Sequence, residues 1–186
     1  DNLFEKSPFE LQSDIMFIKG DLGDELLGGS NRKVPESAGT SGWTWGQLRK
    51  INTMLGNMDK CEDPDAVKEY SALAKFFRAR FYFEKVKRFG DVPWYDKELG
   101  STDEDLYKAR DSREFVMARM IEDIDEAIAG LPDGVSTYRV NKWAALMLKA
   151  QFCLFEGTFR KYHGITFNEG RTADDYPPRV PQPHIY

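Results

Sequence analysis

The feature that most limits the possible folds is a long helical segment, residues 64–89, that is apolar on two opposite sides. One stripe comprises Ala72, Phe76, Ala79, Phe83 and Val86, and the opposite stripe comprises Ala66, Tyr70, Leu73, Phe77 and Phe81. A helix on the surface of a globular protein needs only one apolar stripe. We therefore expect this segment to lie between neighbouring helices, and to end at Gly90, shortly before Pro93.

A second segment, from about residue 139 to residue 163, has the same two-sided pattern. Its stripes are Val140, Trp143, Met147, Ala150 and Leu154 on one side, and Ala144, Leu148, Phe152, Phe155 and Phe159 on the other. We expect this helix also to be buried on both faces. His163 is predicted to end it, because a cation is favourable at the C-terminus of a helix dipole.

The two segments also share a short sequence pattern. The pattern is Arg-Ala-Arg-Phe at residues 78–81 and Lys-Ala-Gln-Phe at residues 149–152, so that Ala79 and Ala150 are 71 residues apart. Tetratricopeptide-type helical hairpins repeat about every 34 residues, so two units would span about 68. A stacked array explains this offset and predicts both alanines at close helix–helix contacts. A chance similarity between two Ala- and Phe-rich helices is the alternative.

Three shorter segments are also predicted to be helical. Residues 7–20 begin with a capping serine and a proline, and residues 44–58 begin with the capping box Thr44–Gln47. Residues 111–131 begin with Asp111 and Glu114 as caps and carry an apolar face. No run of residues alternates as β-strands do. The sequence thus predicts an all-α fold of tetratricopeptide-like stacked helical hairpins with long loops.

Two segments do not follow this helical pattern. Residues 20–43 contain six glycines and are interpreted as a Gly-rich loop, and residues 165–186 form a Pro-rich end. Loops of this length are usually functional or disordered. The helical repeat scaffold is therefore expected to span residues 44–164. Both ends of the chain are interpreted as cuts in a longer protein.

Composition excludes several classes of function. The net charge of −5 argues against a nucleic-acid-binding domain, which usually carries a basic excess. Two cysteines, Cys61 and Cys153, are too few for a disulfide scaffold or a four-cysteine zinc site, and Cys153 is expected in the core. No sequence motif of a hydrolase, a metalloprotease or a nucleotide-binding enzyme is present. We therefore predict no enzyme activity and no cofactor.

Acidic residues offer no convincing metal site. Asp21, Asp24 and Glu25 lie beside glycines, but their spacing does not match a calcium-binding loop. Glu122, Asp123, Asp125 and Glu126 form a cluster within the predicted helix 111–131. We interpret that cluster as a solvated helix face, because it lies opposite the apolar residues.

Aromatic residues near the Gly-rich loop suggest a binding site. Trp43 and Trp45 follow the loop, and Asn31 and Arg32 lie within it. A sugar ring can stack its apolar face on an indole while polar side chains bind its hydroxyls. We predict these four residues as ligand-binding. The alternative is that Trp45, alone or together with Trp43, anchors the core. The same two interpretations apply to Trp94 and Tyr95, and Trp143 is assigned to a core stripe.

Several segments, in order, resemble one family. The most specific is the Arg-, Ala-, Tyr- and Phe-rich helix that ends in Phe89-Gly90-Asp91-Val92-Pro93. It is preceded by the acidic Gly-rich run at residues 20–25 and by Trp45 with Ile51-Asn52. It is followed by Arg110 and Ser112, by residues 121–132 and by residues 138–155. Together these segments resemble the SusD/RagB family of outer-membrane nutrient-binding lipoproteins.

The resemblance implies a non-catalytic protein with a tetratricopeptide-like scaffold. Such a protein would be held at the cell surface by a lipid anchor that this chain lacks. It would bind oligosaccharide or another nutrient and act with a TonB-dependent, SusC-like outer-membrane transporter. The chain would correspond to an N-terminal portion of the family. The alternative is a helical-repeat scaffold for protein–protein interaction, with no glycan contact in this segment.

Overall fold

The computed structural model describes residues 42–134 and 138–163. The chain divides into two units, Asp1–Ser41 and Gly42–Tyr186, and all the described residues belong to the second. Three predicted segments lie outside the described residues and stay predictions: the helix at 7–20, all but the end of the Gly-rich loop at 20–43, and the Pro-rich end at 165–186.

The described part of the chain is all-α, as predicted. Two residues outside the helices, Val92 and Asp111, form an isolated antiparallel bridge, and the described residues contain no longer strand. The elements are α1 (Gly46–Leu55), a 3₁₀ turn η1 (Met58–Lys60), α2 (Pro64–Phe89), a 3₁₀ turn η2 (Glu104–Tyr107), α3 (Arg113–Gly130) and α4 (Lys142–His163).

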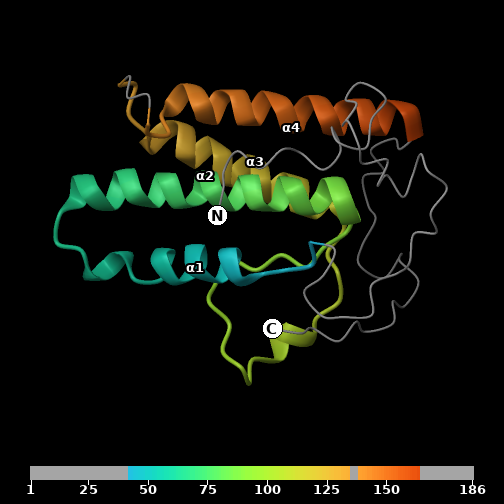
Figure 1. The fold of residues 1–186 in the computed structure, drawn as a ribbon, viewed down its shortest axis with the longest axis horizontal. Coiled ribbons are helices and arrows are strands. Elements are labelled where there is room, and N and C mark those ends of the chain that lie inside the picture. Colours follow the sequence, from blue (N-terminus) through green and yellow to red (C-terminus); the bar gives the residue numbers. More distant parts are fainter. Residues whose placement is uncertain (1–41, 135–137, 164–186) are drawn as a thin grey trace, which may run out of the picture. The chain divides into compact units, whose positions relative to one another are not determined.

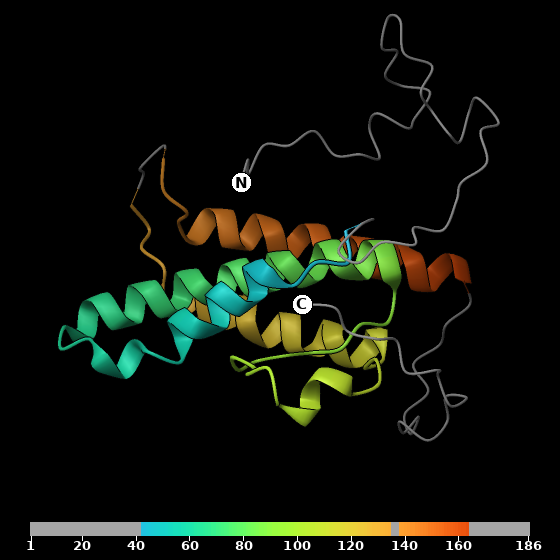
Figure 2. The same cartoon turned by 60° about the horizontal axis from the view of Figure 1, so that its bottom comes forward.

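Helix α2 lies at the centre of the arrangement and confirms the two-sided pattern. It packs against α1 on one side and α3 on the other, and α4 packs mainly on α3 (Figures 1 and 2). Ala79 on α2 is fully buried. The backbones approach closely at Gly130 of α3, where a Cβ atom would lie 2.6 Å from the Cβ of Ala72. Both observations agree with tightly stacked helical hairpins.

Local signals explain where α2 begins and ends. Asp63 precedes it, and its carboxylate accepts hydrogen bonds from the backbone N–H groups of Asp65 and Ala66. Pro64 occupies the first helical position, where a missing N–H costs nothing. Gly90 follows the helix with a positive φ of 71°, a conformation that glycine adopts without steric strain.

Helix α4 differs from the prediction, because only one of its two apolar stripes is buried. Leu148 and Phe152 face the core. On the other side Trp143, Met147 and Leu154 are 60%, 62% and 70% exposed. Ala150 and Cys153 are also exposed, so their expected core positions are wrong, as is the core position given to Trp143. The described helices α2 and α3 cover one face of α4 and leave Trp143, Met147 and Leu154 exposed. Val140, which precedes the helix, packs against the core.

Two predicted helix starts are also corrected. The capping box Thr44–Gln47 does not form, since α1 begins at Gly46 after Trp45 and no side chain caps it. Helix α3 is capped by Ser112, whose hydroxyl accepts a hydrogen bond from the N–H of Phe115 at 3.2 Å. Helix α4 reaches His163, the last described residue, so its predicted end there stays a prediction.

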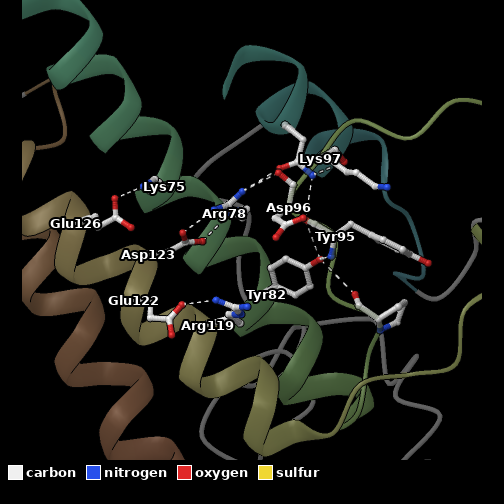
Figure 3. Close-up of polar contacts among 12 residues, drawn as sticks. Lys75, Arg78, Tyr82, Tyr95, Asp96, Lys97, Arg119, Glu122, Asp123 and Glu126 are labelled. Atoms are coloured by element: carbon white, nitrogen blue, oxygen red, sulfur yellow. Dashed lines mark hydrogen bonds and ion pairs between the residues drawn. The ribbon is translucent and has the colours of Figure 1, made fainter. Parts of the chain in front are cut away.

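A buried ion pair joins α2 to α3. The Nε and Nη2 atoms of Arg78 donate to the two carboxylate oxygens of Asp123, each at 2.6 Å (Figure 3). Both side chains are less than one tenth exposed. Asp123 is therefore no part of a solvated acidic face, and its assignment to that face is wrong. Burial raises the pKa of the Asp123 carboxyl, and the Arg78 guanidinium opposes that rise.

The same network holds the segment that follows α2. Arg78 Nη1 donates to the carbonyl of Asp96 at 3.3 Å, and Asn52 of α1 donates to the carbonyls of Tyr95 and Lys97 at 3.0 and 3.1 Å. The hydroxyl of Tyr82 accepts from the N–H of Tyr95 at 2.6 Å (Figure 3). Buried side chains thus supply the hydrogen bonds that this irregular backbone lacks.

We expect the two alanines of the repeated pattern to respond differently to enlargement. Ala79→Leu should lower the free energy of unfolding by about 1–3 kcal/mol, because added methylene groups overpack a filled contact. Ala150→Leu, at an exposed position, should change it by less than about 0.5 kcal/mol. Chemical denaturation of both variants measures the difference, and equal effects would contradict this packing.

We expect loss of the Asp123 charge to be strongly destabilising. Asp123→Asn should lower the free energy of unfolding by about 3–5 kcal/mol, because it leaves the Arg78 guanidinium buried without a counter-charge. Asp125→Asn is the matched control on α3, where the carboxylate is half exposed and pairs with Lys149, and should cost at most about 1 kcal/mol.

The double variant Arg78→Met with Asp123→Leu separates charge from packing. Because it removes both charges, it should recover much of the loss. A single Asp123→Asn variant as stable as its control would show that the pair does not hold α2 to α3.

Candidate functional site

The predicted site residue that stays accessible is Trp43. Its indole is half-buried and meets Trp45 and Phe89 edge-on, with ring centroids 5.2 and 4.8 Å apart. The guanidinium carbon of Arg110 lies 4.7 Å from the centroid of the Trp43 ring, within the range of a cation–π contact. Trp43 is therefore held in place by three side chains while part of it remains in contact with solvent.

Trp45 is a core residue, as its alternative interpretation expects. It is 9% exposed, and its ring centroid lies 5.7 Å from that of Phe81 and 5.6 Å from that of Tyr95. Aromatic rings in tilted or edge-on contact at such distances add to the energy of burial. Trp45 therefore anchors the start of α1 and supports Trp43, and in this arrangement it offers no face on which a ligand could stack.

Lys85 of α2 lies buried beneath these aromatic rings. Its ammonium donates a hydrogen bond to the carbonyl of Gly42, the residue before Trp43. Its Nζ atom lies 4.8 Å from the ring centroid of Phe81 and 5.4 Å from that of Trp45. Burial, together with the nearby charge of Arg88, lowers the pKa of Lys85 to about 8.

The remaining predicted residues fall into two groups. Asn31 and Arg32 lie outside the described residues, so their place beside Trp43 stays a prediction. Trp94 and Tyr95 are buried, and Trp94 stacks on Tyr82 with ring centroids 4.2 Å apart. These two aromatic residues belong to the core.

Three cationic residues near Trp43 were missed in the sequence. Lys85 and Arg88 are on α2, and Arg110 precedes α3. One signal was present: Phe81, Lys85 and Phe89 stand four residues apart, which places a lysine between two phenylalanines on one helix face. No comparable spacing connects Arg110 to Trp43, because their contact depends on the fold.

The described surface also contains a hollow of about 560 Å³ away from Trp43. The start of α2, the end of α3 and the start of α4 line it, through residues that include Asp65, Glu69, Asp133 and Lys142. The described residues that line this hollow include no aromatic side chain. It therefore lacks the flat apolar face that stacking on a sugar ring requires.

The described residues contain no group of side chains suited to hold a metal ion and no helix suited to span a membrane. Within residues 42–134 and 138–163, no three His, Cys, Asp or Glu side chains are grouped so as to hold a metal ion. None of the helices in this part of the chain combines the length and apolarity that crossing a bilayer requires.

A half-exposed indole on a rigid helical scaffold suits binding rather than catalysis, and comparison with known families agrees. Residues 41–154 match a family model described as SusD-like, starch-binding and associating with the outer membrane. The chain belongs to the SusD-like family. SusD-like proteins bind carbohydrate and are not catalytic, in agreement with the predicted family and the predicted absence of enzyme activity.

Solved structures of SusD-like proteins share this fold. One from Bacteroides fragilis is 28% identical with a TM-score of 0.56, and the match covers 61% of this chain and 23% of that one. A laminarin-binding SusD-like protein is 23% identical with a TM-score of 0.56, over 63% and 26% of the two chains. A SusD superfamily protein from Bacteroides vulgatus is 18% identical with a TM-score of 0.55, over 64% and 26%.

The matched part of this SusD-like chain spans about a quarter of the length of these solved structures. No curated protein matches it. The matching region includes α1, α2, α3 and most of α4, so the shared part is the helical scaffold that carries Trp43.

The buried position of Lys85 predicts a pH dependence of stability. Between about pH 8 and 10.5 an unfolded lysine still binds its proton, whereas the folded Lys85 has released it. The unfolded state thus binds more protons, so raising the pH through this range should raise the free energy of unfolding. Below about pH 8 Lys85 is protonated in both the folded and the unfolded state, so it no longer makes the free energy of unfolding depend on pH.

Urea denaturation from pH 7 to pH 10.5 measures this effect against Lys85→Met. Other groups titrate in both proteins, so the quantity of interest is the difference between them. The rise should be absent from Lys85→Met and present in Lys50→Met, which removes an exposed lysine of α1. Parallel curves for wild type and Lys85→Met would contradict the buried position of the ammonium.

Proposed function

We propose that the full-length protein captures oligosaccharide at the cell surface and that Trp43 contributes to the binding site. In this proposal a lipid anchor holds the full-length protein in the outer membrane. A TonB-dependent, SusC-like transporter takes up the captured glycan. The helical part described here serves as the scaffold for both tasks, and the protein performs no chemistry on its ligand.

The observation that carries this proposal is the accessible indole of Trp43 on a rigid base. Stacking on a sugar requires a flat ring whose position is fixed before binding, since ordering a mobile side chain costs free energy. Edge contacts with Trp45 and Phe89 and the stacked guanidinium of Arg110 provide that fixation. The family description as starch-binding and the laminarin-binding protein of similar fold support a glycan as the ligand.

A second candidate function is a scaffold for protein–protein interaction without glycan contact. The exposed stripe of α4, with Trp143, Met147 and Leu154, favours it. Exposed apolar residues in a continuous row commonly mark a surface that packs against other protein. The two functions can coexist in one protein, because the stripe and Trp43 belong to different elements.

Replacement of Trp43 tests the glycan site. In the full-length protein, Trp43→Ala should weaken oligosaccharide binding about 30-fold, since loss of an aromatic anchor typically costs about 2 kcal/mol. Calorimetric titration with laminarin, starch and other oligosaccharides measures the affinity, and a melting curve measures the stability. A modest fall in melting temperature is expected as well, because Trp43 packs on Phe89.

Trp143→Ala is the matched control, because it removes an exposed indole from α4. This control should leave the affinity unchanged. If Trp43→Ala lowers the melting temperature and leaves the affinity of a bound glycan unchanged, Trp43 is a core residue and the proposed site is misplaced.

Association with a transporter can be tested separately. Purification of the full-length protein from its native membrane in mild detergent should recover a large β-barrel protein in a constant ratio. Recovery of the protein by itself in repeated preparations, with the lipid anchor intact, would contradict the partnership.

A further inference from the structure

Positive charge gathers around the backbone of Gly42 and the indole of Trp43. Lys85 donates to the Gly42 carbonyl, and Arg110 stacks on Trp43. Arg88 also lies against Gly42, since a Cβ at Gly42 would lie 3.0 Å from its Nη1 atom. Three cationic side chains thus meet at two consecutive residues, although the chain as a whole carries a net charge of −5.

The charges on α2 in this cluster have no acidic counterpart. Among the described residues, neither Lys85 nor Arg88 forms an ion pair with a carboxylate. By contrast, Lys87 on the same helix turn pairs with Glu84. The charged group that acts on Lys85 is Arg88, and it acts by repulsion. Lys85 and Arg88 therefore keep a local positive field beside Trp43.

The side chains at the rim of this cluster are accessible to a ligand. Arg88 is exposed, and Arg110 and Trp43 are each half-buried, whereas Lys85 lies beneath them. Arginine binds a carboxylate with its planar, fork-like guanidinium, and such charge-assisted hydrogen bonds are stronger than neutral ones. A flat indole beside accessible guanidinium groups offers both contacts that an acidic sugar needs.

We propose that the surface formed by Trp43, Arg88 and Arg110 selects saccharides that contain uronic acids. The indole of Trp43 receives the apolar face of a sugar ring, and the guanidinium groups bind the carboxylate that this ring or its neighbour carries. Lys85 contributes to the field from below and fixes Gly42, without touching the ligand. This inference rests on the proposed glycan site and adds the chemical class of its ligand.

The test titrates the full-length protein with two groups of saccharides by calorimetry. The acidic group comprises polygalacturonate, alginate and hyaluronan, and the neutral group comprises laminarin and starch. At least one acidic saccharide should bind more tightly than every neutral one. Arg88→Gln should weaken its binding about tenfold, since one charge-assisted hydrogen bond is lost, and Arg110→Gln should weaken it by a similar factor.

Arg119→Gln is the control for unspecific attraction, because it removes the same charge from α3 outside this cluster. It should leave the affinity within about twofold, since salt screens distant surface charges. An equal loss in Arg119→Gln and Arg88→Gln would overturn the inference. So would binding of neutral saccharides alone, although the proposed glycan site would then stand. Binding of no saccharide in either group would contradict both.

Discussion

The arrangement of the helices depends on the buried ion pair between Arg78 and Asp123. Two charges removed from water are tolerated only when they meet in good geometry and their remaining hydrogen bonds are satisfied. The two-pronged contact fixes α2 against α3 in one register (Figure 3). Arg78 also reaches the Asp96 carbonyl, so the same guanidinium orders the segment after α2. The close contact between Gly130 and Ala72 acts with the pair, because it also limits how α3 can lie on α2.

The sequence predicted where the helices lie along the chain better than it predicted which of their faces are buried. The bounds of α2 follow from Asp63, Pro64 and Gly90, which act within one turn and need no tertiary contact. The exposure of α4's second stripe could not be predicted in this way. An apolar stripe shows that a face can be buried, whereas its burial depends on which other elements lie against it. Within the part of the chain that the structure describes, Trp143 and Leu154 stay mostly exposed.

The position of Asp123 shows where helical periodicity was misjudged. Val116, Met120 and Ala127 are fully buried on α3, and Asp123 stands in the same row at a spacing of three to four residues. Grouping it with its sequence neighbours Glu122 and Asp125 concealed this register. A carboxylate within an apolar row indicates a buried partner of opposite charge. The sequence contained that signal, but only the structure could identify Arg78 as the partner.

The candidate site was predictable in part, because one helix forms both the core and the base of the site. Trp43 was found from its aromatic character beside a Gly-rich loop. The cations around it were not, since they come from α2 and from the segment before α3. Lys85 and Phe89 lie on the same helix as Arg78, so the ion pair that fixes α2 also fixes the base on which Trp43 rests.

Because α2 forms both the core and the base of the candidate site, a charged residue, Lys85, lies under the aromatic rings of Trp45, Phe81 and Phe89. A leucine at position 85 would be easier to bury, yet it could not hold the Gly42 carbonyl or carry a charge beside the rings. The lowered pKa of Lys85 shows that burial of this ammonium is unfavourable. A residue that lowers stability while it holds the backbone beside an accessible indole fits the proposed binding role of Trp43. The contacts of Lys85 thus join the helical core to the proposed ligand surface.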